Sequence, residues 1–498
     1  MFKSGFLLLN LVASAQTASL LPRETSECCK VLQTAGLKHV YFPEDPAYTQ
    51  RIASYWSLTA QLTPYCIVEP ETAHDVSLAI TTLVQRTACN FAVRSGGHSA
   101  NAGANNIDAG VTIDLHRMNS TTHNPATATA SLLPGARWLD VYQHLDALNL
   151  SVQGGRNGGV GVGGLVLGGG CSYYMYARGL VCDSVRGFEV VLANGTMIEA
   201  NAGANADLWV ALKGGGAGNF GIVTRVDMEV FPRTPIWVAA RRFPAGLEGV
   251  GEKHVEALVE WVDGVAGYRN ASALVFWTYK LADNGTVVNT RLTDVGGRAA
   301  PPVFDKFLAI EGNISSDVGM TNLSTLSPNT VSYGYRNIWL TLTFKNDARM
   351  LKKVVELHDV LVEEMKQVIL DGDFETQAFF QPLPTIISQH SIERGGNILG
   401  IDKIEDNAII WLGSVAVNTV EQEEIGRQKI YAWKDAVEEY SKSIGAFLSY
   451  RYCNYAEQSQ SVMRSYGEEN FRKMQVVADK YDPERVFQTR VPGGFKLV

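Results

Sequence analysis

Glycine dominates residues 154–170, which read GGRNGGVGVGGLVLGGG. Because glycine has no side chain, this density in a folded chain indicates a backbone that passes very close to something flat or charged. Residues 94–99 and 213–221 form two further glycine-rich turns. A surface loop is the simpler interpretation of any single run, but three runs together favour the walls of a shared ligand site.

Two of these runs match the pattern GxGxxG, at residues 159–164 and 216–221. A dinucleotide-binding fingerprint follows a strand, opens a helix and is followed by an acidic residue about 20 positions later. Neither match has this setting, and residues 222–224 continue as a strand after the second one. We therefore expect no nicotinamide Rossmann site. Separated glycine loops that jointly line one long cofactor fit better, since pyrophosphate needs backbone N–H donors and a flat ring needs a backbone shelf.

The turn at residues 94–99 also carries a nucleophile. A short apolar strand over residues 90–93 leads into Arg94-Ser95-Gly96-Gly97-His98-Ser99. The adjacent glycines permit a tight bend, and the exposed backbone amides can face an anion. The imidazole of His98 lies at this bend, and an ordinary hydrogen-bonded histidine is the alternative interpretation.

Composition and charge exclude several classes of protein. The chain has 498 residues, of which 46% are hydrophobic and 19% charged, so we expect two or three folded domains. A formal charge of −8 argues against nucleic acid as the main partner, because phosphate binding needs a concentrated basic face. The histidines and cysteines lack HxxxH, HExxH and CxxC spacing, so no metal site is expected.

The N-terminus resembles a secretory signal. Lys3 precedes an apolar run over residues 6–12, and small residues follow at 13–15, so we expect a signal peptide at residues 1–20, with a buried helix as the alternative. The run is too short to span a membrane. Seven glycosylation acceptor motifs point to the same route and begin at Asn119, Asn149, Asn194, Asn270, Asn284, Asn313 and Asn322. We expect a secreted, monomeric glycoprotein.

The seven cysteines suggest one or two disulfides together with free buried thiols. The expected bridge joins Cys28 or Cys29 to Cys66.

Periodicity predicts an α+β protein in three parts. The first part, residues 21–235, opens with a βαβ-like unit and includes a half-buried strand at Val111, Ile113 and Leu115 and a type I′ hairpin at Asn194-Gly195. The second part, residues 236–445, is expected to be a sheet covered by helices. Its predicted strands are residues 236–243, 273–279, 337–344 and 408–417, and its predicted helices are residues 350–370 and 421–443. The tail, residues 446–498, is expected to fold back onto the first part.

These motifs resemble the flavin oxidases with a PCMH-type FAD-binding domain, in particular the secreted fungal members of the berberine bridge enzyme-like group. The matching stretches cover the proposed FAD domain in the family's order and are weak across residues 236–445; they are residues 64–70, 94–99, 160–164, 167–170, 179–185, 207–209, 213–223, 452–455 and 481–483. The resemblance implies a two-part FAD-binding domain with an inserted α+β substrate domain, an antiparallel sheet covered by helices.

The family's functional residues carry over position by position. His98 aligns with the histidine bonded to the flavin 8α-methyl, residues 94–99 with the pyrophosphate region, and residues 214–223 with the segment beside the ring. The resulting FAD-binding set is Arg94, Ser95, Gly96, Gly97, His98, Ser99, Val160, Gly163, Gly164, Gly168, Gly169, Gly218, Asn219, Gly221, Ile222, Asn454 and Tyr455. Val160 is also expected to influence oxygen access to the flavin.

One departure from the family concerns the second flavin link. Many relatives carry a cysteine shortly before the Val-Gly-x-Gly-Gly segment, but this chain has Gly155-Arg156-Asn157 there, and Cys171 lies beyond the run. We therefore expect a single covalent link, through His98.

Tyr452 matches the family tyrosine that deprotonates or orients the substrate, with aromatic packing as the alternative. A free tyrosine has a pKa of about 10, so a role as base requires strong tuning by its surroundings. Gln377, Gln381 and His390 are weaker candidates for substrate contacts.

The expected function is a secreted FAD-dependent oxidase that oxidises a C–H/hydroxyl or amine centre of a small molecule, uses O2 and releases H2O2. The absence of a second covalent flavin link favours a fungal secondary metabolite as the substrate, and an oligosaccharide is the alternative. In a third option, the flavin pocket guides a cyclisation of the substrate. A redox-inactive secreted binding glycoprotein is the alternative from another class.

Overall fold

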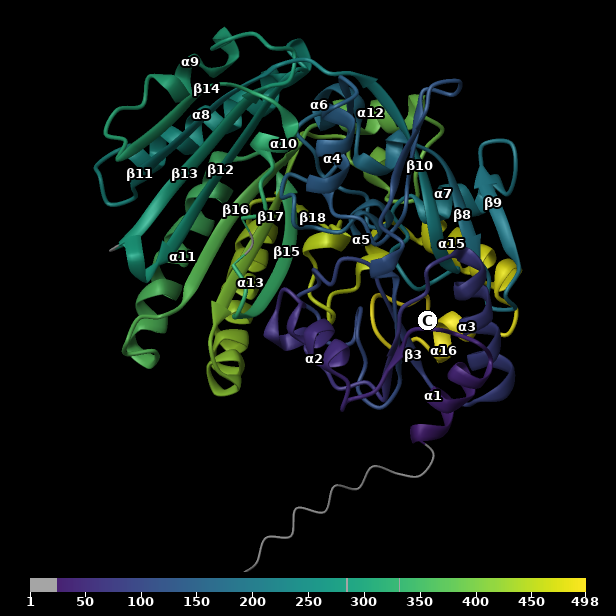
Figure 1. Ribbon diagram of the computed structural model, residues 1–498. Helices are drawn as coiled ribbons and strands as arrows, with labels where there is room; N and C mark the ends of the chain where they lie inside the picture. Colours follow the sequence, from purple (N-terminus) through teal and green to yellow (C-terminus); the bar gives the residue numbers. More distant parts are fainter. Residues whose placement is uncertain (1–24, 284, 331) are drawn as a thin grey trace, which may run out of the picture.

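The computed structural model describes residues 25–283, 285–330 and 332–498, and its strands form three sheets (Figure 1). The expected signal peptide and Asn284 lie outside the described residues. None of the described helices is long and apolar enough to cross a membrane.

The first sheet has four strands in the order β1-β2-β4-β3. Their bounds are β1 Val40–Tyr41, β2 Cys66–Val68, β3 Phe91–Arg94 and β4 Val111–Asp114. The strands β2 and β3 both run parallel to β4, which lies between them in the sheet. The two strands of the predicted βαβ-like opening are therefore not neighbours, because β4 separates them. The strand expected at Val111, Ile113 and Leu115 is confirmed as β4, but the expectation that it is half-buried was wrong. All four residues of β4 are buried because it is a central strand, with Asp114 paired to arginines.

The second sheet is antiparallel and contains the long strand β10 at its centre. Its strands are β5 Thr121–Asn124, β6 Thr129–Leu132, β7 Leu150–Val152, β8 Val185–Val191, β9 Met197–Asn201 and β10 Ile222–Pro232. The hairpin β8–β9 is confirmed, but its turn is not type I′. Of the central residues only Gly195 has a positive φ (83°), and the Gly195 N–H donates to Leu192. The Leu192 N–H donates to Thr196 O, so the loop has three residues, 193–195, and requires only one left-handed position.

The third sheet has eight antiparallel strands in the order β14-β11-β13-β12-β16-β17-β15-β18. They are β11 Ile236–Pro244, β12 Ala271–Lys280, β13 Gly285–Asp294, β14 Ser315–Thr321, β15 Arg336–Lys345, β16 Glu375–Leu383, β17 Ala408–Val417 and β18 Phe447–Leu448. The four predicted strands are β11, β12, β15 and β17, and the other four were missed. Helices α8 Val250–Gly264, α11 Ala348–Val368 and α13 Val420–Ser443 pack against the sheet, which confirms a helix-covered antiparallel sheet (Figure 1).

The remaining helices are mostly short. They are α1 Thr25–Thr34, α2 Pro46–Ala53, α3 Ala73–Arg86, α4 Trp138–Asp146, α5 Val162–Leu167, α6 Met175–Arg178, α7 Ala206–Leu212, α9 Asp305–Leu308, α10 Leu323–Leu326, α12 Ile386–Glu393, α14 Val462–Ser465, α15 Glu468–Tyr481 and α16 Val486–Thr489. Thr72 and Asp75 form a capping box that starts α3, and Val76, Ile80 and Leu83 lie on its buried side. The yellow C-terminal segment in Figure 1 returns to the first two sheets.

The eight-stranded sheet is fixed to the N-terminal part by a short junction. The Leu58 N–H donates to Tyr335 O at 2.9 Å, and the Asn337 N–H donates to Ser57 Oγ at 3.0 Å. Because Trp56 directly precedes this junction and β15 begins there, both elements have fixed positions at the cavity described below.

Two disulfides tie α1 to the first sheet. Cys29 pairs with Cys66 at the start of β2, as expected for one of the two adjacent cysteines, and Cys28 pairs with Cys89, a bridge that the sequence did not indicate. Cys171, Cys182 and Cys453 are free.

Replacing Cys29 and Cys66 together by alanine removes a bridge with a sequence separation of 37. We expect the free energy of unfolding to fall by about 3 kcal/mol, because the unfolded chain regains the freedom of that loop. Thermal unfolding followed by circular dichroism in non-reducing buffer measures the change. The control is Cys182→Ala, which removes a buried thiol without opening a loop; equal transition temperatures for the two variants would contradict this prediction.

Candidate functional site

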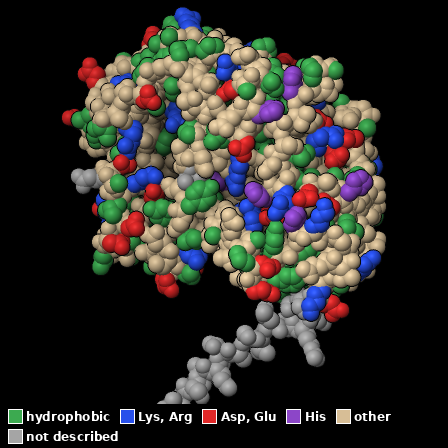
Figure 2. All heavy atoms as spheres, viewed as in Figure 1, with side chains coloured by type: hydrophobic (Ala, Val, Ile, Leu, Met, Phe, Trp, Pro, Cys, Tyr) green, Lys and Arg blue, Asp and Glu red, His purple; other side chains and the backbone are tan. Residues whose placement is uncertain are grey.

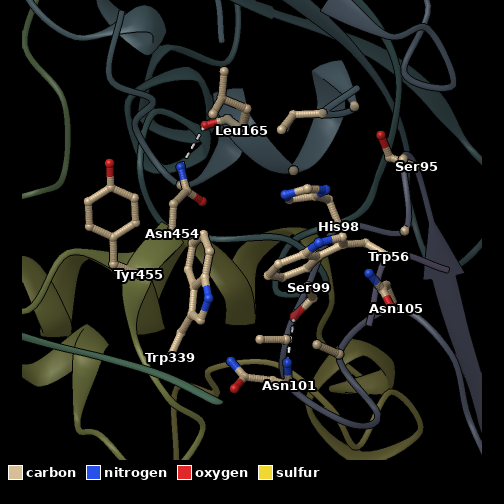
Figure 3. A pocket seen from close by; sticks show the side chains of 18 of the residues that line it. Trp56, Ser95, His98, Ser99, Asn101, Asn105, Leu165, Trp339, Asn454 and Tyr455 are labelled. Carbon is tan, nitrogen blue, oxygen red and sulfur yellow. Dashed lines mark hydrogen bonds between the residues drawn. The ribbon is translucent and has the colours of Figure 1, made fainter. Parts of the chain in front are cut away.

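A cavity of about 580 Å³ lies where the glycine runs meet the eight-stranded sheet. Its lining comes from the His98 turn, the glycine run after α4, residues 216–223, the strands β12 and β15–β17, and the C-terminal tail. Figure 3 shows the facing side chains of His98, Trp56, Trp339, Asn454 and Tyr455. Over the outer face in Figure 2, acidic and basic side chains are interspersed.

The His98 turn and the glycine run are in direct backbone contact. A Cβ added to Gly96 would lie 2.6 Å from Gly161 Cα, and one added to Gly161 would lie 2.5 Å from Gly96 N. Ser95 Oγ donates to Pro134 O and accepts a hydrogen bond from the Gly163 N–H at 3.2 Å. The two loops can approach this closely only because both crossing residues are glycine.

The His98 ring is stacked on Trp56, with centroids 4.3 Å apart and planes at 13° (Figure 3). Its Nδ1 is buried and has no hydrogen-bond partner among the described residues. Burial lowers the pKa of His98 to about 3, and the nearby Arg137 guanidinium acts in the same direction. The imidazole is therefore neutral at physiological pH, with an unused ring nitrogen at the cavity wall.

The tail closes the other side of the glycine run. Asn454 Nδ2 donates to Leu165 O at 3.1 Å (Figure 3), and a Cβ on Gly168 would lie 2.0 Å from Asn454 Oδ1. Gly493, Gly494 and Phe495 line the cavity at another point. The cavity thus depends on the C-terminal segment as much as on the glycine runs.

Tyr452 lies on the cavity wall but is only 1% exposed. Its hydroxyl accepts a hydrogen bond from Asn454 Nδ2 at 3.3 Å. Burial raises the pKa of Tyr452 well above 10, and its neighbours Cys171 and Tyr455 act in the same direction. The surroundings therefore keep the hydroxyl protonated, which is opposite to the tuning that a base would need.

The cavity floor consists of two rows of side chains across four strands. The register aligns Thr278, Gln377, Ser414 and Trp339 in one row and Lys280, Glu375, Ala416 and Asn337 in the next. Alternate residues of a strand share a face, so each strand contributes one residue to each row. Of these only Gln377 was expected, because no local sequence pattern reveals which strands are neighbours.

Most of the predicted FAD-binding residues line the cavity together. They are Ser95, Gly96, Gly97, His98, Ser99, Val160, Gly163, Gly164, Gly168, Gly218, Gly221, Ile222, Asn454 and Tyr455. Trp56, Trp339 and Asn101 line it as well and were missed.

Arg94 does not reach the cavity. The side chain is 0% exposed and points into the first sheet, where it pairs with Asp114 at 3.3 Å, its register partner on β4. Its Nη1 donates to Arg51 O, and its guanidinium lies 3.7 Å from the Tyr55 ring centroid. Arg94 therefore supports the strand that carries the His98 turn, which corrects its expected place at the pyrophosphate.

Two further predicted FAD contacts also lie behind the wall. Asn219 donates to Gly215 O and to Phe495 O, each at 2.9 Å, so its amide links a glycine loop to the tail. Gly169 faces Leu399.

Of the three weaker candidates for substrate contacts, one lines the cavity and two do not. Gln377 lines the cavity, whereas His390 faces Tyr176 O and Glu393, away from it. Gln381 lies behind the lining and accepts a hydrogen bond from Arg156. Cys171, beyond the glycine run in sequence, nevertheless lines the cavity in space.

Comparison with known proteins agrees with this geometry. Residues 64–201 match the FAD binding domain family. The chain is 37% identical to the FAD-dependent monooxygenase drtC of Aspergillus calidoustus, over 95% of this chain and 90% of that protein.

Two solved structures share the fold. The first is Physcomitrella patens BBE-like 1 (TM-score 0.76, 18% identity, covering 95% of this chain and 99% of that one). The second is glucooligosaccharide oxidase from Acremonium strictum, described with a 6-S-cysteinyl, 8α-N1-histidyl FAD (TM-score 0.73, 19% identity, 95% and 99%). On this evidence the chain belongs to the FAD-dependent oxidoreductases with a PCMH-type FAD-binding domain, and it shares the fold of the berberine bridge enzyme-like proteins.

Proposed function

We propose that this FAD-dependent oxidoreductase is a secreted oxidase that holds its flavin through one covalent bond to His98. The observation that carries the link is the buried Nδ1 of a neutral His98 at the cavity wall, which has no hydrogen-bond partner in the described part of the chain. A neutral imidazole has one ring nitrogen with the lone pair that attack on the flavin 8α-methyl requires, and Nδ1 holds this lone pair in the tautomer that is protonated at Nε2. The histidyl link described for glucooligosaccharide oxidase supports this proposal.

The glycine-lined arm of the cavity fits a long, flat cofactor because no side chains fill it. Ser95, Gly96, Gly97 and Ser99 would face the pyrophosphate, and Gly218, Gly221 and Ile222 would lie beside the ring. When bound, FAD supplies a two-electron acceptor that takes hydride from a substrate carbon and is reoxidised by O2 with release of H2O2. The segment at 155–157 contains no cysteine, which supports a single link.

Tyr452 is proposed to orient the substrate rather than to act as a free base. Its protonated hydroxyl can donate a hydrogen bond to a substrate oxygen while it accepts one from Asn454. Val160, which lines the cavity, is proposed to control the approach of O2.

The remaining features of the proposal concern organisation and setting. Residues 21–235 and 446–498 would form the FAD-binding domain of a monomer, with residues 236–445 as the inserted substrate domain. Two disulfides and the glycosylation motifs support secretion. A fungal secondary metabolite is the proposed substrate, and similarity to a fungal FAD-dependent monooxygenase supports this over an oligosaccharide.

Replacing His98 by alanine tests the covalent link. We expect His98→Ala to release its flavin into the supernatant after acid precipitation, whereas the native protein retains yellow colour in the pellet. The matched control is Cys171→Ser, which changes the nucleophilic thiol of the same cavity and should retain the link. Mass spectrometry of flavin-bearing peptides gives the site directly; flavin on a Cys171 peptide would refute the single link.

The oxidase reaction is tested by peroxide release across sugars and across aromatic or polyketide alcohols. We expect one mole of H2O2 per mole of product. Incorporation of ¹⁸O from ¹⁸O2 into the product would instead indicate a monooxygenase, and protein without flavin absorption would indicate the redox-inactive binding protein.

Replacing Tyr452 by phenylalanine tests its orienting role. We expect Tyr452→Phe to lower kcat/KM about 30-fold, the effect of one lost hydrogen bond of about 2 kcal/mol, with unchanged flavin content. Because the native hydroxyl stays protonated, the pH profile of kcat should keep its shape in the variant. Loss of an ionisation between pH 6 and 9 would show that Tyr452 acts as a base.

A further inference from the structure

Arg156 carries the unbalanced charge of the cavity. The lining residues that are charged near neutral pH are Arg156, Lys280 and Glu375. Lys280 Nζ and Glu375 Oε2 lie 2.8 Å apart, so these two charges neutralise each other. Across the described ranges, no Asp or Glu carboxylate lies within ion-pair distance of Arg156. The lining side chains therefore leave one net positive charge in the cavity.

The guanidinium is held in place by neutral groups. Its Nη1 donates to Gln381 Oε1 at 2.7 Å, and its Nη2 donates to the Tyr455 hydroxyl at 2.8 Å. The Gln381 amide is itself oriented, because its Nε2 donates to the Tyr176 hydroxyl at 3.1 Å and to Pro382 O at 3.0 Å. Arg156 is thus fixed before any ligand enters.

A fixed cation without an anion is costly, because neutral hydrogen-bond acceptors offset only part of the free energy lost when a charge is removed from water. The two neutral oxygen acceptors use two of the five N–H groups of the guanidinium. Its planar fork suits a carboxylate or another delocalised oxygen anion.

The surroundings of Arg156 are aromatic. The Tyr455 ring makes edge contacts with Trp339 at 6.0 Å, Phe379 at 6.1 Å and Tyr452 at 4.8 Å between centroids. Trp339 and Tyr455 both face the cavity (Figure 3). A planar, conjugated body would find apolar contacts directly beside the cation.

We propose that Arg156 binds an anionic oxygen of the substrate, and that the substrates are planar organic acids, with a carboxylate or an ionised enol or phenol. The inference rests on the proposed function, because it assigns the substrate class of the same cavity. The hydrogen bond to Gln381 on β16 places the Arg156 guanidinium toward the eight-stranded sheet. A neutral sugar offers no charge to balance it.

The test is calorimetric titration of the flavin-loaded enzyme with 2-naphthoate and with its neutral analogue 2-naphthamide, in the absence of oxygen. We expect native protein to bind naphthoate at least 10-fold more tightly than naphthamide. In Arg156→Gln the affinity for naphthoate should fall about 30-fold, the usual effect of losing a charged hydrogen bond, while that for naphthamide changes less than twofold.

Three controls make the result specific. Arg156→Lys keeps the charge but loses the fork, so an intermediate affinity for naphthoate is expected. Arg349→Gln removes an exposed arginine that lies outside the cavity and should retain the preference for the acid. Absorption at 450 nm verifies that each variant holds flavin before titration.

The proposal fails if native protein shows no preference for the acid, including binding of neither compound, or if Arg156→Gln retains the preference. It also fails if Arg156→Gln shifts the flavin reduction potential and leaves the preference for naphthoate unchanged. The Arg156 guanidinium would then interact with the flavin and not with the substrate. Binding is measured without turnover, so absence of peroxide release would refute the oxidase and leave this test intact.

Discussion

The contact between Gly96 and Gly161 is the constraint on which the site depends. At this crossing the backbone of one loop occupies the space that a side chain of the other would need. The crossing brings the His98 turn, at the end of a parallel strand, against the glycine run that begins α5. Arg94 and Asp114 hold that strand from behind. The contact between Gly96 and Gly161 thus sets both the position of the His98 imidazole and the shape of the cavity beside it.

The two sides of the cavity are built on different principles. The side formed by the glycine runs is shaped by the absence of side chains and presents mainly backbone. The side formed by the eight-stranded sheet presents side chains in ordered rows, which strand register holds in fixed relation. A fold made in this way can keep its cofactor side constant while substitutions in the rows alter what is bound. Arg156 lies between these sides and is hydrogen-bonded to the sheet through Gln381.

Much of the cofactor side could be predicted from the sequence because its signals are local. His98, the glycine run and the Tyr452–Tyr455 segment are short motifs, and the structure brings them to one cavity. The errors have a common physical cause. Arg94 was placed at the cavity because its neighbours in sequence are there, but alternate residues of a strand point to opposite faces. Trp56, the floor rows and the Cys28–Cys89 bridge depend on pairings between distant segments, which periodicity does not encode.

The cavity wall begins at Trp56 and includes Phe495, so its parts span almost the whole chain. During synthesis, residues 64–201 leave the ribosome long before the residues that complete the wall. Asn454 and the 493–495 segment can join the glycine loops only afterwards. A cofactor that needs the finished wall can therefore bind only after the whole chain has been synthesised.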